Sequence, residues 1–206
     1  MSGTNDHGRQ HWHNLLRTWS VAPIQADQKF DDVRTAHAGL GRFYHTLDHV
    51  LAVLATVESL APQANNPNAV KLAAWLHDVI YDSQASDNEE RSAEYAKRLC
   101  DELAIPEGHR VAALIRKTKT HDAGDDVDAQ VLLDADLAIL GTSESDYQAY
   151  AEKIRREYAC VPETEYRKGR RQVLATFLTR PRIFHFLSHL EEPARRNLAA
   201  EIVRLA

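Results

Sequence analysis

Apolar residues recur at steps of three and four along almost the whole chain, and this spacing constrains the fold more than any other feature of the sequence. Trp12, Leu15 and Leu16 are the first example. Such spacing places apolar side chains on one face of an α-helix, which can then be buried against the rest of the protein. No segment alternates apolar and polar residues over the length of a strand. The sequence therefore predicts an all-α protein, one bundle of about nine or ten helices.

Glycine, proline and asparagine clusters separate the expected helices. The two most apolar segments, residues 70–80 and 128–140, are expected at the centre of the core. A capping box formed by Asp87 and Glu90 is expected to begin the helix that follows residue 87. The remaining helices are expected over residues 12–19, 27–37, 47–57, 106–118, 143–158, 164–179 and 191–205.

The balance of residue types is that of an ordinary globular protein. The chain has 206 residues, of which 44% are hydrophobic and 27% charged, and this size favours one domain. A net charge of −5 does not favour nucleic-acid binding. Residues 167–182, however, contain six basic and no acidic residues. This segment predicts either a solvent-exposed helix face or a patch that attracts phosphate, and both interpretations stay open.

Cysteine usage and hydropathy both indicate a cytoplasmic protein. Cys100 and Cys160 are too few for a disulfide framework or a cysteine-based zinc site, and they fit a reducing compartment. No apolar run approaches the roughly 20 residues that cross a bilayer. Residues 1–10 are polar and lack the pattern of a secretory signal. We therefore expect no membrane partner.

Carboxylates interrupt the two most apolar segments. His77 and Asp78 are expected inside one helix, and Asp134 and Asp136 inside another. A buried, ionised Asp costs several kcal/mol unless it is paired or binds a metal. Two helices that each place a carboxylate in the core would repel one another without a cation. His49, at the start of a third apolar helix, can face the same point.

A structural interpretation of these residues is a buried His77–Asp78 hydrogen bond and a helix cap made by Asp134. The complete set favours a metal site instead, because two imidazoles and two carboxylates form a mixed nitrogen and oxygen donor set. Such a set suits one divalent ion of manganese, iron, cobalt, nickel, zinc or magnesium. On an octahedral ion it leaves positions open for water and substrate.

The order His49, then His77–Asp78, then an Asp between Ala and Leu resembles the H…HD…D signature of HD-domain metal-dependent phosphohydrolases. The residues that surround these motifs are also similar to those of small bacterial proteins identified as predicted HD-superfamily phosphohydrolases. The resemblance implies a helical, single HD-like domain over residues 1–206, with its core motifs in 40–160 and the terminal helices packed on it. The matching stretches are Arg42–His45 with His49, Trp75–Tyr81, Asn88–Ala93 and Leu133–Leu137.

The resemblance also implies the metal ligands. His49, His77 and Asp78 match the first three ligands of the family. The last ligand of the family follows Ala, which matches Asp136 better than Asp134. Asp134 would then be an acceptor behind the ligands or a packing carboxylate.

The segment from Tyr44 to His49 resembles one in cyclic-nucleotide phosphodiesterases, where the first His donates a proton to the leaving oxygen. This resemblance implies a catalytic proton donor at His45, one helical turn from His49. Thr46 replaces an Asn of that family, so cyclic-nucleotide specificity is not implied. The alternative is that His45 is a helix-terminal residue bonded to backbone.

Four further residues are candidates for activating water or binding the substrate. Glu89 could orient or deprotonate water, while Glu90 is assigned to the capping box. His121, Lys117 and Lys119 end a helix near a loop and could hold phosphate oxygens. For the two glutamates, a solvent-exposed helix face is the alternative.

We therefore expect a metal-dependent phosphohydrolase that acts on a nucleotide or another small phosphorylated metabolite. One alternative is a diiron HD oxygenase, for which His109 and His121 are the available extra ligands. Their spacing places them on different helical faces and disfavours this function. The other alternative is a binding protein that keeps the metal as a structural element. The oligomeric state stays open, a homodimer included.

Overall fold

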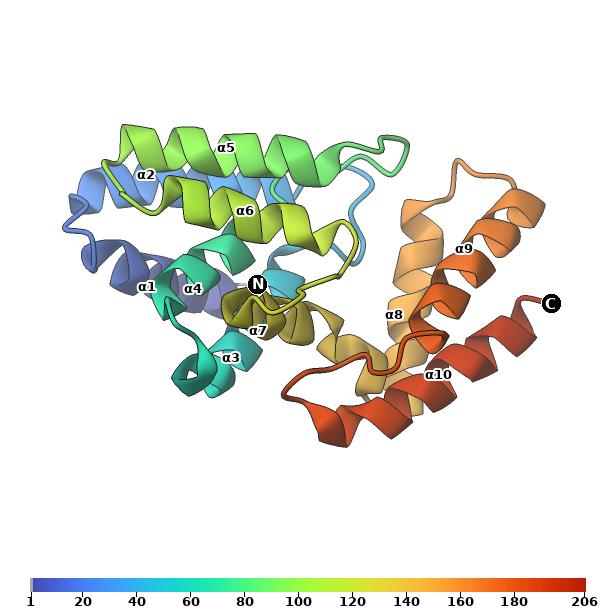
Figure 1. The fold of residues 1–206 in the computed structure, drawn as a ribbon. Coiled ribbons are helices and arrows are strands. Elements are labelled where there is room, and N and C mark those ends of the chain that lie inside the picture. The colour runs from blue at the N-terminus through green and yellow to red at the C-terminus, as the bar shows by residue number, and fades with distance from the viewer. Residues whose placement is uncertain (1) are drawn as a thin grey trace.

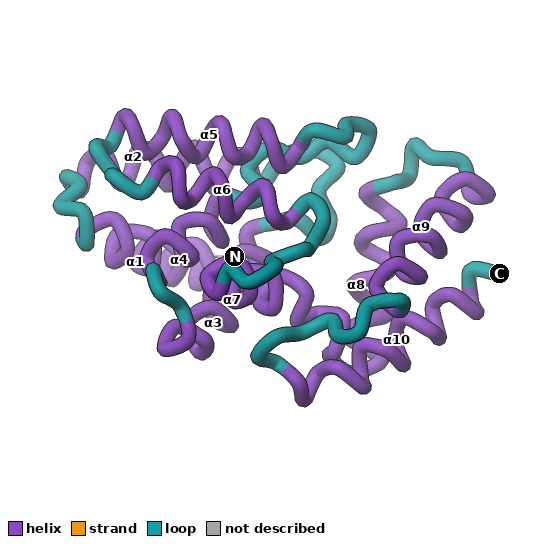
Figure 2. The backbone as a smooth tube through the Cα atoms, viewed as in Figure 1, coloured by secondary structure: helices purple, strands orange, loops and turns teal. Residues whose placement is uncertain are grey.

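The computed structural model describes residues 2–206, with side chains from residue 6 onward, and this range contains ten α-helices, three short 3-10 helices and no strand (Figure 2). The predicted all-α class is confirmed. Within the described range, no helix has both the length and the apolar character needed to cross a bilayer. The α-helices are α1 (Ser2–Arg17), α2 (Pro23–His37), α3 (Leu47–Leu60), α4 (Pro67–Leu76), α5 (Asn88–Glu102), α6 (Gly108–Thr118), α7 (Val127–Leu137), α8 (Glu144–Glu157), α9 (Glu163–Leu178) and α10 (Glu191–Arg204).

Helix α4 lies at the centre of the core and contacts α1, α3, α5, α6 and α7 (Figure 1). Seven of its ten residues are buried. The Trp75 ring meets Trp12 of α1 and Phe30 of α2 edge to face, with ring centroids 5.3 and 6.1 Å apart. Burial of these large rings explains the apolar stripe of the first helix, because aromatic side chains remove more surface from water than other residues do.

The helix expected over residues 70–80 ends earlier, so His77 and Asp78 lie in the turn after α4 and not within a helix. The reason is a tertiary contact from a distant part of the chain. The Arg42 guanidinium donates hydrogen bonds to the backbone oxygens of Asp78 (2.7 Å) and Val79 (3.0 Å). Because these two carbonyl oxygens already accept hydrogen bonds from Arg42, they do not need the backbone N–H donors that a further turn of helix would supply.

The capping box expected before α5 is wrong. The Asp87 side chain makes no hydrogen bond to the first turn of the helix. Glu90 instead accepts two hydrogen bonds from the Arg116 guanidinium on α6, at 2.8 and 2.6 Å. An ion pair between neighbouring helices has replaced the expected local contact.

The C-terminal helices α8, α9 and α10 lie together on one side of the molecule (Figure 1). Residues 138–141, expected to continue α7, form a 3-10 helix on which α10 packs. A Cβ atom on Gly141 would lie 2.6 Å from Cβ of Leu190, so only glycine permits this approach. A buried Arg170–Glu201 ion pair (2.8 Å) connects α9 with α10.

The basic segment at residues 167–182 does not form one patch. Arg167 is exposed and pairs with Glu163 on the same helix. Arg170 is buried in its pair with α10, whereas the Arg180 guanidinium reaches the loop after α6. Arg167 therefore fits the solvent-exposed helix face, and phosphate binding by this segment stays a prediction.

Candidate metal centre

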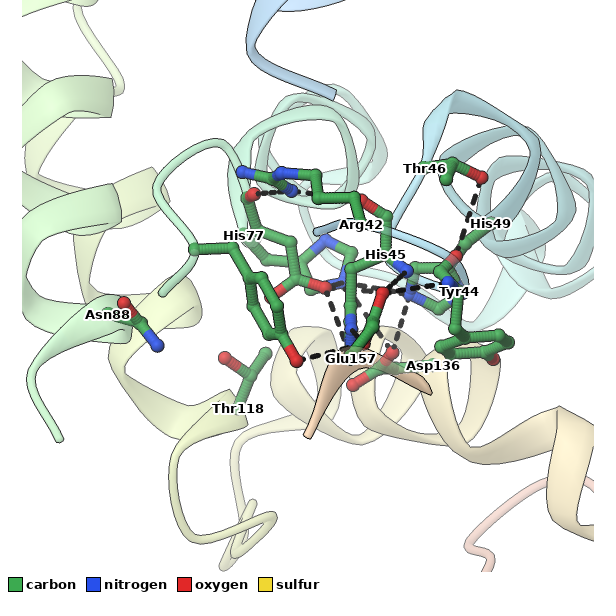
Figure 3. Close-up of polar contacts among 12 residues, drawn as sticks. Arg42, Tyr44, His45, Thr46, His49, His77, Asn88, Thr118, Asp136 and Glu157 are labelled. Carbon is green, nitrogen blue, oxygen red and sulfur yellow. Dashed lines mark hydrogen bonds and ion pairs between the residues drawn. The ribbon is translucent and has the colours of Figure 1, made fainter. Parts of the chain in front are cut away.

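Four side chains from three separate segments converge at one point (Figure 3). His49 comes from the first turn of α3, His77 and Asp78 from the turn after α4, and Asp136 from the last turn of α7. His49 Nε2 lies 3.2 Å from His77 Nε2 and 3.2 Å from Asp136 Oδ1. His77 Nε2 lies 3.2 Å from Asp78 Oδ2 and 3.5 Å from Asp136 Oδ1. One donor atom each from His49, His77 and Asp78 lies within 4.8 Å of the other two.

The chemistry of the converging atoms fits a cation. His77 Nδ1 lies 2.9 Å from the backbone oxygen of Ala74, which requires a proton on Nδ1. In the neutral ring, the lone pair of Nε2 then faces the carboxylate oxygens of Asp78 and Asp136. A backbone contact that sets the tautomer in this way is typical of metal-binding histidines. Two imidazole nitrogens and two carboxylate oxygens are therefore able to hold one divalent ion.

Both carboxylates of the centre are ionised at neutral pH. Burial opposes the charge on Asp78, but in the metal-free protein the charges of His77 and His45 in their protonated forms outweigh burial and hold the pKa of Asp78 below its ordinary value. Burial likewise opposes the charge on Asp136. Hydrogen bonds from His121 and His49 outweigh it and place the Asp136 pKa well below the usual range. Two negative charges in a buried site match the charge of a divalent ion.

His45 lies beside this cluster. Its Nε2 is 3.9 Å from Asp78 Oδ2, and its Nδ1–H donates to Glu157 Oε2 at 2.6 Å. The ring stacks on Tyr81, with centroids 4.3 Å apart and an angle of 28° between the planes. Burial disfavours the charged imidazolium. The Asp78 charge and the Glu157 hydrogen bond outweigh burial, so the pKa of His45 is raised.

Glu157, the last residue of α8, is a site residue that the sequence analysis did not find. Its Oε1 accepts the backbone N–H groups of Phe43 (2.7 Å), Tyr44 (2.7 Å) and His45 (3.0 Å). Its Oε2 also accepts the Tyr81 hydroxyl at 2.8 Å. Burial opposes its charge, but the His45 hydrogen bond outweighs burial and lowers the pKa of Glu157 to about 2.

The sequence does contain one signal for Glu157. It follows Tyr147, Tyr150 and Ile154 at helical steps and therefore lies on the buried face of α8. A charged residue at such a position requires a partner. The backbone partners and His45 lie more than a hundred residues earlier in the chain and Tyr81 lies 76 residues earlier, which the helical period alone cannot show.

Arg42 connects the two segments that carry the site. Its Nη1 donates to the backbone oxygens of His45 (2.9 Å) and Asp78 (2.7 Å), and its Nη2 donates to Val79 O (3.0 Å). The loop before α3 and the turn after α4 are thus held at a fixed distance, which positions the His45 ring relative to Asp78.

Asp134 and Asp136 have different surroundings. Asp134 is fully buried, and its oxygens accept backbone N–H groups of His185, Phe186 and Leu187 at 2.6–3.1 Å. It neither faces the cluster nor caps a helix, but holds the loop before α10. Of the two candidates for the last ligand, Asp136 is the one whose carboxylate lies beside His49 and His77.

The other predicted residues are divided between the site and the surface. His121 Nε2–H donates to Asp136 Oδ2 at 3.2 Å, so His121 orients this carboxylate from behind. Lys119 and Glu89 line the cavity that adjoins the centre. Among the described residues Glu89 makes no hydrogen bond to the centre, and Lys117 does not line the cavity.

The family model of the HD domain matches residues 46–157. This match covers more than half of the chain and contains the four converging side chains. The chain belongs to the HD-domain family. Comparison with curated proteins and with solved structures gives no match. His45 lies just before the HD-domain match, and Glu157 is its last residue.

A cavity of about 890 Å³ opens beside the metal centre and extends between the HD domain and the C-terminal helices. His45, Asp78 and Asp136 line one end. Helix α9, outside the HD-domain match, contributes much of the opposite wall. Tyrosine and apolar side chains surround the middle of the cavity, and the aromatic ones are Tyr44, Tyr81, Tyr150, Tyr158, Tyr166 and Phe177.

The two extra histidines required by the oxygenase alternative do not meet. His109 is exposed on α6 and does not line the cavity, whereas His121 contacts Asp136. Within the described residues, this HD domain therefore has one compact donor set and not two.

Proposed function

We propose that this protein is a metal-dependent phosphohydrolase that acts on a small phosphorylated metabolite or a nucleotide. One observation carries the proposal. The converging nitrogen and oxygen donors lie at the end of a cavity, next to an imidazole that is not needed as a ligand.

A divalent ion at His49, His77, Asp78 and Asp136 would supply a Lewis acid for a phosphoryl oxygen and a nucleophile drawn from water at neutral pH. The chain itself provides the proton for the leaving group. Because Glu157 holds Nδ1 of His45, the opposite nitrogen of the ring faces the cavity. The Asp78 charge and the Glu157 hydrogen bond raise the pKa of His45, which favours the protonated ring that can donate to the leaving oxygen.

The surrounding residues position these groups. Arg42 sets the separation of His45 from the turn after α4, and His121 orients Asp136. Tyr81 covers one face of the His45 ring and restricts its rotation. Glu89 is assigned to the cavity wall in this proposal, because it makes no hydrogen bond to the centre among the described residues.

The test is elemental analysis of the purified protein, followed by a screen of phosphorylated metabolites for phosphate release. We expect one metal ion per chain and turnover of a subset of the compounds. Two irons per chain with an oxygen-dependent activity would favour the oxygenase alternative. A full metal equivalent without turnover of any compound would favour a structural ion.

A further inference from the structure

Within residues 6–206, Lys119 and Arg180 on the cavity wall form no ion pair with a carboxylate. Glu90 interacts with the charge of Lys119 but forms its ion pair with Arg116. Arg180 donates to the backbone oxygens of His121 (2.6 Å) and Thr120 (2.7 Å), and its guanidinium lies over the Phe177 ring, 4.7 Å from the centroid. Lys119 Nζ donates to the backbone oxygen of Ser86 at 2.7 Å. Carbonyl oxygens use some of the N–H donors of these groups but do not neutralise their charges.

The remaining arginine of the cavity lining is neutralised. Arg170 lines the same cavity and pairs with the buried Glu201 at 2.8 Å. Two carboxylates, Glu89 and Glu165, also line the cavity. In the described part of the chain, neither of these two carboxylates forms an ion pair with Lys119 or Arg180. Among the described residues, Lys119 and Arg180 therefore carry unpaired charges on a wall where Arg170 is paired.

Arg180 is connected to the metal centre through His121. The backbone oxygen of His121 accepts from Arg180, while the side chain of the same residue donates to Asp136. A bound divalent ion would already balance the charges of Asp78 and Asp136. Lys119 and Arg180 then provide two further positive charges, in a cavity long enough to reach beyond the metal centre.

We propose that the substrate carries a second phosphate group, which binds Lys119 and Arg180 while the scissile phosphate lies at the metal centre. Two cations match the double negative charge of a phosphate better than the single charge of a carboxylate. Only the assignment of the scissile end rests on the proposed function. The substrate class is therefore a small bisphosphate, and Arg180, outside the HD-domain match, selects it.

The test measures binding of ligands with stable carbon–phosphorus bonds to the metal-loaded protein by calorimetry. The set comprises alkane bisphosphonates with spacers of two to six carbons, alkyl monophosphonates of equal length and the matching phosphonocarboxylates. We expect one spacer length to bind about 10- to 100-fold more tightly as the bisphosphonate than as the monophosphonate, which is the range for added charged hydrogen bonds.

The double variant Lys119→Gln/Arg180→Gln should lose this preference and keep its affinity for the monophosphonate. The matched control Lys153→Gln/Arg182→Gln removes the same charge from exposed positions that do not line the cavity, and it should retain the preference. Arg180→Lys should retain part of it, because the charge remains. If the double variant does not fold, Lys119→Gln alone carries the test.

Four results would overturn the proposal. The first three are equal affinity of bisphosphonates and monophosphonates at every spacer length, an unchanged preference in the folded double variant, and equally tight binding of the phosphonocarboxylates. Loss of monophosphonate affinity in the double variant would place the two cations at the scissile phosphate and also contradict it. Because these ligands are not hydrolysed, an absence of phosphatase activity would count against the proposed function and leave the binding preference measurable.

Discussion

The metal centre and the loop anchors of this protein both bury carboxylates, but the atoms that face those carboxylates differ. At the anchors, Asp134, Glu157 and Asp128 accept backbone N–H groups from loops distant in the sequence. At the centre, Asp78 and Asp136 face imidazole nitrogens whose lone pairs can bind a cation. Burial of a carboxylate therefore does not identify a metal ligand. The presence or absence of backbone N–H donors around it distinguishes the two kinds.

The two kinds of carboxylate should respond differently to substitution. Removing an anchor leaves several backbone N–H groups buried without partners, which lowers the free energy of unfolding. Removing a ligand lowers affinity for the ion, and in the metal-free protein it takes a carboxylate partner away from the neighbouring histidines. Each prediction below tests one side of this comparison, from the largest expected effect to the smallest.

Replacement of a ligand should have the largest effect. We expect Asp78→Ala to abolish both metal binding and turnover, because the remaining donors lose the carboxylate that follows His77. Elemental analysis and phosphate release measure the two outcomes. A variant that still holds a full equivalent of metal would contradict the ligand assignment.

His45→Ala should leave the metal content intact and reduce turnover by about 10²–10⁴, the usual contribution of a positioned proton donor. The loss should be greatest for substrates with poor leaving groups. A nitrophenyl ester expels a stable anion and should lose much less. Equal losses on both substrates, with lower thermal stability, would assign His45 a structural role.

Asp134→Asn and Asp136→Asn form a matched pair two residues apart. Asp134→Asn should lower the free energy of unfolding by about 2–5 kcal/mol and leave metal binding unchanged, because an amide NH₂ would face backbone N–H groups. Asp136→Asn should weaken metal binding and destabilise the metal-free protein less than Asp134→Asn does, because the amide oxygen can still accept a hydrogen bond from His121. Urea unfolding and metal titration distinguish the two, and the reverse pattern would exchange their roles.

Metal removal should destabilise the protein as a whole. At a free metal concentration 100 times the Kd, binding contributes about 3 kcal/mol to the folded state. For a chain of this size, we expect a chelator to lower the Tm by roughly 5–10 °C. Calorimetric scans with and without metal measure the shift. An unchanged Tm in protein shown to be metal-free would count against the site.

The anchor Glu157 should make stability depend on pH in the acid range. Its pKa is lowered from 4.5 to about 2 in the folded protein, so the stability it contributes is complete above pH 4.5 and is lost as the pH falls through 2. The contribution is up to about 3 kcal/mol. We expect the stability difference between wild type and Glu157→Gln to shrink from pH 5 to pH 2.5. A constant difference would show that this carboxylate does not titrate with folding.

Much of the fold follows from local sequence. Helical spacing predicts the all-α class because the period of a helix is a local property, and the boundaries of α2, α9 and α10 fall within a few residues of those expected. The end of α4 does not follow from local sequence. Arg42, more than thirty residues earlier, supplies the partners that allow the chain to leave the helix at His77.

The sequence by itself determined that buried carboxylates and histidines would require partners, since polar residues within apolar helical segments have few other ways to be satisfied. Only the tertiary structure decided what those partners are. It brought His49, His77, Asp78 and Asp136 together, and it directed Asp134 to the loop before α10. The physical reason is that backbone N–H groups carry no sequence signature, so the donors that satisfy a buried carboxylate become visible only when distant loops are packed against it.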